Sequence, residues 1–279
     1  MKLEPALLDF LKRALRTAQL LKFEDFVIEQ DCVRGWNASR TAIIADRNVP
    51  ELPFTGIGIN RVAKLLQRLA MMDTYTLDLE IKNEFVMGLV IKGDGATMKY
   101  KCANPNAIKT PKHIKDIPTW SLEFSPVDIE RVHKAQAAMN APNLQIKSDE
   151  EGNVVLRLTD AERDTYEQTV VGHVKNIGPM SDINNVLAFD KQYDAVTLLS
   201  VLKAADGSKE DKAPEDTTEV KAPEEAKDGN PPEEAKEVKE VKVPKGPTKF
   251  TVGQGGNLSI SVNGIIINVV PIVPNKVVL

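Results

Sequence analysis

The feature that most constrains this chain is an internal duplication, because the same order of elements is predicted twice. In each half, a helix is followed by strand runs, then by a second helix and further strand runs. The halves occupy residues 1–108 and 119–279, and residues 109–118 form a connector punctuated by prolines. Self-similarity of this kind is evidence about architecture in its own right. It predicts two similar domains of mixed helices and strands.

Each half opens with a helix signal. Pro5 stands at the start of the first, and leucines follow at helical spacing, at positions 7, 8, 11 and 15. In the second half, Ser125 predicts an N-cap and Pro126 the first helical position. Its apolar stripe, with Ile129 and Val132, is thin.

A second helix is predicted in each half. Asn60 is expected to cap a helix over residues 61–70, and Asp190 to open one over residues 191–205. Alternating apolar and polar runs bounded by turn residues predict the strands, with a hairpin turn at residues 149–153.

Residues 206–247 differ from the rest in composition. They carry 13 acidic and 8 basic residues, a balance of −5, with several prolines and no aromatic residue. Such a segment cannot bury enough apolar surface to offset its ordering entropy, so we predict a disordered acidic insertion. A tolerated expansion of a surface loop explains it, and a functional tether is the sharper alternative.

The charge of the remaining chain limits how it could contact nucleic acid. The net charge of the whole is −4, so the chain without residues 206–247 carries +1. A conventional nucleic-acid binder shows a strong basic excess. Any DNA contact must therefore come from a local basic surface.

No pattern for chemistry is found. The two cysteines, Cys32 and Cys102, are far apart, which argues against a disulfide framework and fits a reducing, cytoplasmic setting. The three histidines lack the spacing of metal ligands, and no phosphate-loop pattern occurs. We therefore predict no catalytic residue, cofactor or metal. Apolar runs stay well short of the roughly 20 residues that a membrane span needs, and no secretory pattern opens the sequence.

Three stretches carry a resemblance to a known family. They are QLLKFEDFVIEQ after the first helix, the connector before TWSLEF with its Pro111–Lys112 and Ile117–Pro118 pairs, and SPVDIERVHKAQ followed by LQIKSDEEGNVVLRL. With the duplicated order, they make the chain resemble the DNA sliding clamps. The trimeric clamp of T-even-type phages is the most similar, and the eukaryotic and archaeal proliferating-cell clamp is more distant. The resemblance covers nearly all of the chain except residues 206–247.

The resemblance implies an α+β clamp fold, in which helices lie on one face of antiparallel sheets in two similar domains. It implies a processivity factor that is not an enzyme. As a homotrimeric ring, the protein would encircle duplex DNA without regard to sequence and tether a DNA polymerase. An ATP-dependent clamp loader would open the ring. The location would be the cytoplasm, that of the host cell for a phage protein.

A clamp of this kind needs positive charge on the helix faces that line its hole, without contacts that read sequence. The basic residues of the first half lie opposite its apolar stripes, and those of the second half are sparser. The predicted DNA-facing residues are Lys12, Arg13, Arg16, Arg61, Lys64, Arg68, Arg131 and Lys134. The same charges would also suit the solvated faces of ordinary amphipathic helices.

Ring closure needs an exposed strand edge at each end of the subunit. By resemblance, these edges are residues 96–103 and 166–174. The predicted subunit interface comprises Met98, Tyr100, Cys102, Thr169, Val171 and His173. Ordinary strands within a monomer are the alternative.

The partners of clamps insert a short peptide into an apolar pocket beneath the connector. The residues that the resemblance assigns to this pocket are Ile114, Ile117, Val270, Pro271 and Ile272. Exposed apolar residues in a connector fit such a site, and they equally fit anchors that hold the loop.

Two rival functions remain at this point. A monomeric processivity factor would bind one side of the duplex without closing, and the near-neutral charge outside residues 206–247 argues against it. A non-enzymatic, β-rich viral structural protein would present the basic helices merely to solvent.

Overall fold

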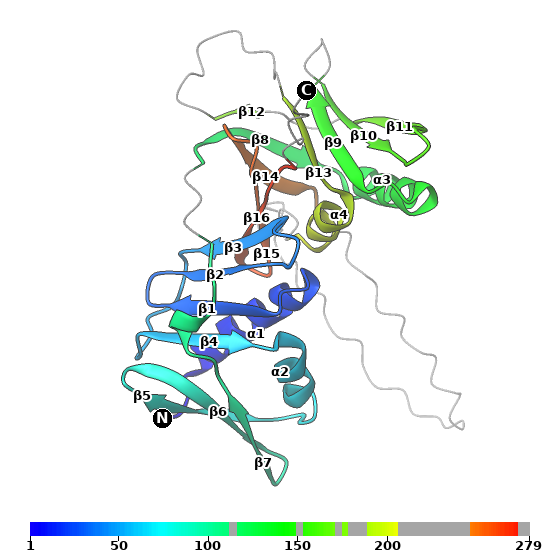
Figure 1. Cartoon of the computed structure of the whole chain (residues 1–279). Helices are drawn as coiled ribbons and strands as arrows, with labels where there is room; N and C mark the ends of the chain where they lie inside the picture. Colours follow the sequence, from blue (N-terminus) through cyan, green and yellow to red (C-terminus); the bar gives the residue numbers. More distant parts are fainter. Residues whose placement is uncertain (112–115, 149–152, 171–174, 178–188, 206–245, 273–279) are drawn as a thin grey trace, which may run out of the picture.

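The computed structural model describes residues 1–111, 116–148, 153–170, 175–177, 189–205 and 246–272 (Figure 1). Most of the predicted insertion, residues 206–245, lies outside the described residues, as do residues 149–152 of the predicted hairpin turn. Within the described part, the duplicated order of helices and strands is confirmed.

The first domain contains two helices and seven strands. They are α1 (Pro5–Leu20), β1 (Asp25–Glu29), β2 (Val33–Trp36), β3 (Ala42–Asp46), β4 (Gly56–Asn60), α2 (Val62–Leu69), β5 (Thr76–Lys82), β6 (Phe85–Gly93) and β7 (Ala96–Lys101). A short 3-10 helix, η1 (Pro105–Ala107), follows on the way to the connector.

The second domain repeats this order, with β8 and β12 as two additional strands. Its elements are β8 (Pro118–Phe124), α3 (Pro126–Met139), β9 (Asn143–Ser148), β10 (Val154–Thr159), β11 (Thr165–Val170), β12 (Lys175–Asn176), β13 (Asp190–Asp194), α4 (Ala195–Ala204), β14 (Thr248–Gly253), β15 (Leu258–Val262) and β16 (Ile265–Val269). The antiparallel pairing of β9 with β10 confirms the predicted hairpin.

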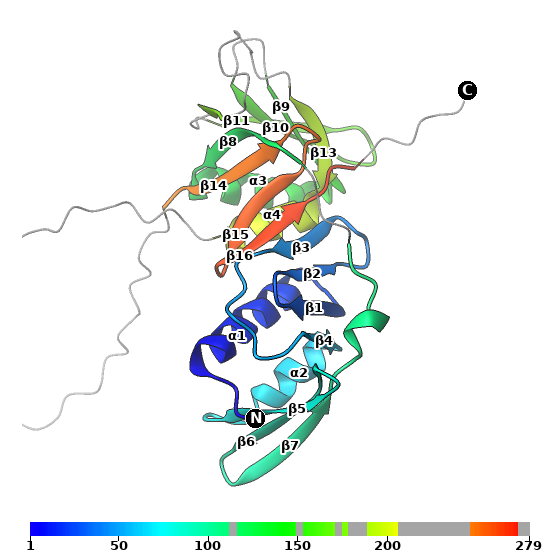
Figure 2. The same ribbon diagram turned by 90° about the vertical axis from the view of Figure 1, so that its left-hand side faces the viewer.

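Two sheets carry the fold. The larger runs β12-β8-β14-β15-β16-β3-β2-β1-β4-β6-β5, with β7 paired to β6, and the smaller runs β11-β10-β9-β13. Figure 2 shows how the larger sheet continues from β16 of the second domain into β3 of the first. The helices pack in pairs, α1 with α2 and α3 with α4, and both pairs lie on the same side of this sheet (Figure 1). The α+β class with helices on one face of largely antiparallel sheets is thus confirmed.

The strand order of the two domains corresponds element by element. The run β3-β2-β1-β4 in the first domain matches β11-β10-β9-β13 in the second, and β5-β6-β7 matches β14-β15-β16. Strand β3 therefore corresponds to β11, and β7 corresponds to β16. Within the chain, β16 pairs with β3, so one pair of corresponding edges is already joined.

The core follows the apolar stripes of the sequence. In α1, Leu7, Leu11 and Leu15 are buried at helical spacing, and Ala14 and Ala18 allow the backbone to approach the sheet. In α3, only Ile129 and Val132 are buried, as its thin stripe predicts. Among the described residues, none of the helices combines the length and the apolar character that crossing a bilayer requires.

The predicted start of α3 is confirmed, since the Ser125 hydroxyl accepts a hydrogen bond of 3.1 Å from the Asp128 N–H. The predicted cap at Asn60 is wrong. Asn60 ends β4, its side chain accepts from the Tyr100 hydroxyl at 3.0 Å, and Arg61 stands between it and α2 with a left-handed φ of 53°. The side chain of Asn60 is therefore engaged by the sheet and does not reach the helix.

The predicted helix over residues 191–205 begins too early. Residues Asp190–Asp194 form β13, in which Tyr193 is completely buried, and the helix begins at Ala195. Asp194 is its N-cap, because a carboxylate oxygen of Asp194 accepts from the Thr197 N–H at 2.7 Å. The alternating burial of β13 and its pairing with β9 outweigh a capping signal read from Asp190.

Candidate nucleic-acid interface and sheet edges

The predicted DNA-facing residues all lie on α1, α2 and α3 or directly before α2. Three of them are exposed and make no side-chain hydrogen bond or ion pair within the described part of the chain: Arg16, Lys64 and Arg131. Lys134 pairs with Glu130 at 2.8 Å, and the Lys12 ammonium lies 4.6 Å from the centroid of the Tyr75 ring. Positive charge is thus present on three helices on the same side of the large sheet. That these residues meet DNA stays a prediction.

Arg61, which directly precedes α2, and Arg68 of α2 both reach the strand β7. Arg61 Nη2 donates to the Lys101 carbonyl at 3.0 Å, and Arg68 Nη1 donates to the Lys99 carbonyl at 3.0 Å. Both guanidinium groups therefore bind the sheet edge in the isolated subunit, a contact that the sequence pattern does not predict.

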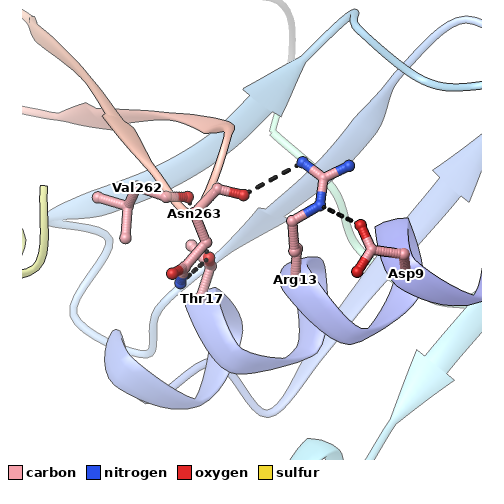
Figure 3. A network of polar contacts seen from close by, with 5 residues as sticks. All are labelled: Asp9, Arg13, Thr17, Val262 and Asn263. Atoms are coloured by element: carbon pink, nitrogen blue, oxygen red, sulfur yellow. Dashed lines mark hydrogen bonds and ion pairs between the residues drawn. The ribbon is translucent and has the colours of Figure 1, made fainter. Parts of the chain in front are cut away.

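Arg13 belongs to the junction between the domains, which we call the seam and define as the β3–β16 pairing with the adjoining contacts of α1 (Figure 3). Its guanidinium pairs with Asp9 at 3.0 Å and donates to the Asn263 carbonyl at 3.2 Å. One turn later, the Thr17 hydroxyl bonds to the Val262 carbonyl at 3.3 Å. The first helix of one domain thus holds the β15–β16 turn of the other.

The seam is also held by backbone pairing and a buried carboxylate. Ile267, Asn268 and Val269 pair with Ile44, Ile43 and Ala42. Asp46, only 1% exposed, extends this ladder, because its Oδ2 accepts from the Ile266 N–H at 3.0 Å and its Oδ1 from the Asn48 N–H at 2.8 Å. Asp46 is not among the predicted site residues, although an acidic residue that ends the apolar strand AIIAD is a usable signal.

Replacing Asp46 by asparagine is expected to lower the free energy of unfolding by about 1–3 kcal/mol. The amide keeps the shape of the side chain but turns an NH₂ group toward one of the two buried backbone N–H donors. That backbone N–H is then left without an acceptor. Denaturant unfolding measures the effect. Asp9→Asn is the matched control, since Asp9 is 69% exposed and its surface ion pair contributes little. Equal effects of the two substitutions would contradict the role of Asp46 in the seam.

Two strand edges remain open in the described part of the chain. Strand β7 pairs only with β6, and β11 pairs only with β10. The other sheet ends are short or covered: β12 has two residues, and β5 is bonded along its outer side by residues 1–3. Strand β13 is bridged by Ile272, whose N–H donates to the Gln192 carbonyl at 2.7 Å. The open edges are the counterparts of the two strands that form the seam.

The predicted interface residues differ in where their side chains lie. Met98 is half-buried and Thr169 is exposed, whereas Val171 and His173 lie outside the described residues. Tyr100 and Cys102 are 1% and 3% exposed and belong to the subunit's own core, so their side chains are not available to a partner. Cys102 also lies beyond the open edge, because β7 ends at Lys101 and the Cys102 N–H donates to Met87 of β6.

Burial also governs the reactivity of the cysteines. It raises the pKa of the Cys102 thiol to about 12, and that of the Cys32 thiol to about 12. Both thiols therefore stay protonated at pH 8, and we expect iodoacetamide to alkylate them at least about a hundredfold more slowly in the native protein than in denaturant. Mass spectrometry over a time course measures this rate. Modification of the native protein at the rate of a free thiol would contradict the buried positions.

The end of the connector is anchored by Asp116. Its Oδ1 accepts from the Gly255 N–H at 2.8 Å, and its Oδ2 accepts from the Asn257 N–H at 3.1 Å and the Asn257 side-chain amide at 2.8 Å. A cavity of about 360 Å³ lies beside it, with Arg47, Ser259 and Asn268 in its lining. The connector thus ends over a polar cavity next to the seam.

The predicted peptide pocket is not assembled around this cavity. Ile114 lies outside the described residues, Ile117 is 57% exposed, and Val270, Pro271 and Ile272 are half-buried. None of these four described residues lines the polar cavity. The N–H groups of Val270 and Ile272 bond to Thr41 and Gln192, which places this segment in strand pairing. The apolar peptide pocket stays a prediction.

Neither a protein-family model nor a curated protein sequence matches this chain. Solved structures match over nearly its whole length. The PCNA of Thermococcus kodakaraensis has a TM-score of 0.56 at 10% identity, over 98% of this chain and 99% of that one. The A. fulgidus PCNA, bound to the C-terminal region of FEN-1, has a TM-score of 0.51 at 12% identity, over 96% and 97%.

A beta clamp matches as well. The H. pylori protein, solved with 5-chloroisatin, has a TM-score of 0.56 at 12% identity, over 96% of this chain and 62% of that one. At such identities, a structural likeness shows the fold alone. The chain has the fold of the sliding clamps, with two similar domains.

Proposed function

We propose that this protein is a subunit of a sliding clamp, a homotrimeric ring that encircles duplex DNA and tethers a DNA polymerase. The observation that carries the proposal is the correspondence of edges. Strands β16 and β3 are joined within the chain, and their counterparts β7 and β11 are open. Pairing β7 of one subunit with β11 of the next would form, between subunits, a junction like the seam within the chain.

Such pairing is head-to-tail, because the two edges are different surfaces of the same chain. Head-to-tail contacts give a closed ring when the rotation between subunits closes, and an open filament when it does not. A ring of three chains contains six similar domains and six similar seams. Every long edge is then paired, which removes the aggregation hazard of an open strand.

The electrostatics support DNA inside the ring. Both helix pairs lie on the same side of the large sheet, and basic side chains occur on α1, α2 and α3 (Figure 1). The exposed Arg16, Lys64 and Arg131 meet phosphates without reading bases, as sliding requires. The near-neutral charge of the chain outside residues 206–247 favours topological retention over tight electrostatic binding.

The proposed partners follow from the clamp role. They are the polymerase, an ATP-dependent clamp loader and other proteins that dock a peptide near Ile114, Ile117 and residues 270–272. A. fulgidus PCNA, which shares the fold, binds the C-terminal region of FEN-1. That complex supports the proposal that a peptide docks on this chain. We propose no catalytic residue and no cofactor. Kinship with the phage clamps in particular, and a place in the host cytoplasm, remain part of the proposal.

A threading experiment tests the ring. Linear duplex DNA is fixed to beads at one end, incubated with the protein, blocked at the other end with streptavidin and washed in 1 M salt. We expect retention on this DNA, and none when the end is blocked before the protein is added. Loss of the protein in both orders would support a one-sided binder. No association in low salt would support a structural protein.

A further inference from the structure

Two arginines contact the open edge of β7, and the pairing of β7 with β6 determines which backbone groups that edge presents. The Cys102 N–H donates to the Met87 carbonyl at 2.9 Å, so even-numbered residues of this segment bond to β6. In antiparallel pairing the direction alternates, and the odd-numbered residues present their N–H and C=O groups to the open side. Lys99 and Lys101, which accept from Arg68 and Arg61, are two of these.

The arginines are held in place by the aromatic ring of Tyr100. The guanidinium carbons of Arg61 and Arg68 lie 5.3 and 5.7 Å from the centroid of this ring. The Tyr100 hydroxyl is fixed in turn by its hydrogen bond to Asn60 at 3.0 Å. A buried, oriented ring thus presents its surface to two cations whose donors point to the strand edge.

Among the residues that the structure describes, the seam within the chain lacks this pair of arginines over a tyrosine ring. At that junction the corresponding helix, α4, carries small and apolar residues in most of its length, and its Thr197 hydroxyl lies 3.0 Å from the Thr41 hydroxyl of the first domain. Near β16, Arg13 donates to the Asn263 carbonyl, which belongs to the β15–β16 turn and not to the paired edge of β16. In the described part of the chain, arginines bond to the carbonyls of a strand edge beside β7, whose edge is open.

We propose that Arg61 and Arg68 form a removable cap on the β7 edge, which an incoming β11 strand from a second copy of this chain displaces. An antiparallel strand brings N–H donors to the carbonyls of Lys99 and Lys101, the same acceptors that the arginines use. The cap satisfies these carbonyls in the free subunit and lowers its tendency to pair with the wrong strand. This inference rests on the proposed function, since it concerns the same seam between subunits.

The test compares assembly without DNA for the wild type, the double variant Arg61→Ala/Arg68→Ala and the control Lys82→Ala/Lys109→Ala. The control removes the same charge from two exposed residues outside β7, and it leaves the cap in place. We expect the arginine variant to assemble at roughly tenfold lower concentration than the wild type. The control is expected to stay within about twofold. Sedimentation over a concentration series gives the midpoints.

Several results would overturn the cap. Weaker assembly of the arginine variant would show that the arginines bridge the subunits. An equal shift of the arginine variant and the control from the wild-type midpoint would show a charge effect alone, and no shift in either would show that the cap has no influence on assembly. If the alanine variant does not fold, Arg61→Lys/Arg68→Lys carries the test, because lysine keeps the charge but not the planar fork. A monomeric wild type with an associating arginine variant would support the cap and refute the ring. Monomers throughout the series would overturn both.

Discussion

Replacing Lys99 by proline is expected to separate the proposed ring into monomers that remain folded. The Lys99 N–H lies on the open side of β7, so its loss leaves the pairing with β6 intact. In the proposed ring, the same position would lie within a paired strand, where proline removes a hydrogen bond and adds a steric clash. A cost of about 3 kcal/mol or more corresponds to association at least about a hundredfold weaker at each contact between subunits.

Lys99→Ala is the matched control for this substitution. It removes the same surface ion pair with Glu80, which is 50% exposed and contributes little, but it keeps the backbone donor. We expect the alanine variant to assemble like the wild type, and all three proteins to show similar circular dichroism at 20 °C. Assembly of the proline variant at the wild-type midpoint would exclude the β7 edge from the subunit contact.

Removing the free positive charges from the helices is expected to have the second large effect. Arg16, Lys64 and Arg131 lack a side-chain hydrogen bond or ion pair in the described part of the chain, so they are available to phosphates. Alanine favours helix formation and keeps the fold. For the triple alanine variant, we expect the slope of log affinity against log salt to flatten by about one unit or more. DNA affinity at low salt is expected to fall at least about tenfold.

The charge-matched control for this variant changes Lys82, Lys109 and Arg163 to alanine. These exposed residues lie on a strand, in the connector and in the β10–β11 turn, and none is on a helix. A salt titration by fluorescence anisotropy on a short duplex compares the two variants. The same loss of slope in both would mean that DNA responds to total charge, and the helix faces would have no special role.

The local signals in the sequence identified much of the fold. Pro5 and Ser125 mark the true starts of α1 and α3, because capping and φ restriction act within one turn. The caps predicted at Asn60 and Asp190 are wrong, since both residues belong to strands whose partners are distant in sequence. Local capping patterns carry no information about such pairing.

The candidate site was less accessible from the sequence. The pairing of Ile267 with Ile44 joins residues from opposite ends of the chain, and no short-range pattern reports it. Arg61 and Arg68 were recognised as basic residues at helical spacing, but their contact with β7 depends on the path of a strand some 30 to 40 residues later. The correspondence of open and joined edges became visible only when the strand order of both domains was known.

The solution mass of the full-length protein, measured by light scattering across a concentration series, tests the ring most directly. The ring predicts a plateau at three times the chain mass of 30.7 kDa, with no further growth at higher concentration. A mass of one chain at every concentration would contradict the pairing of β7 with β11. A mass that rises without a plateau would show that the edges pair but do not close.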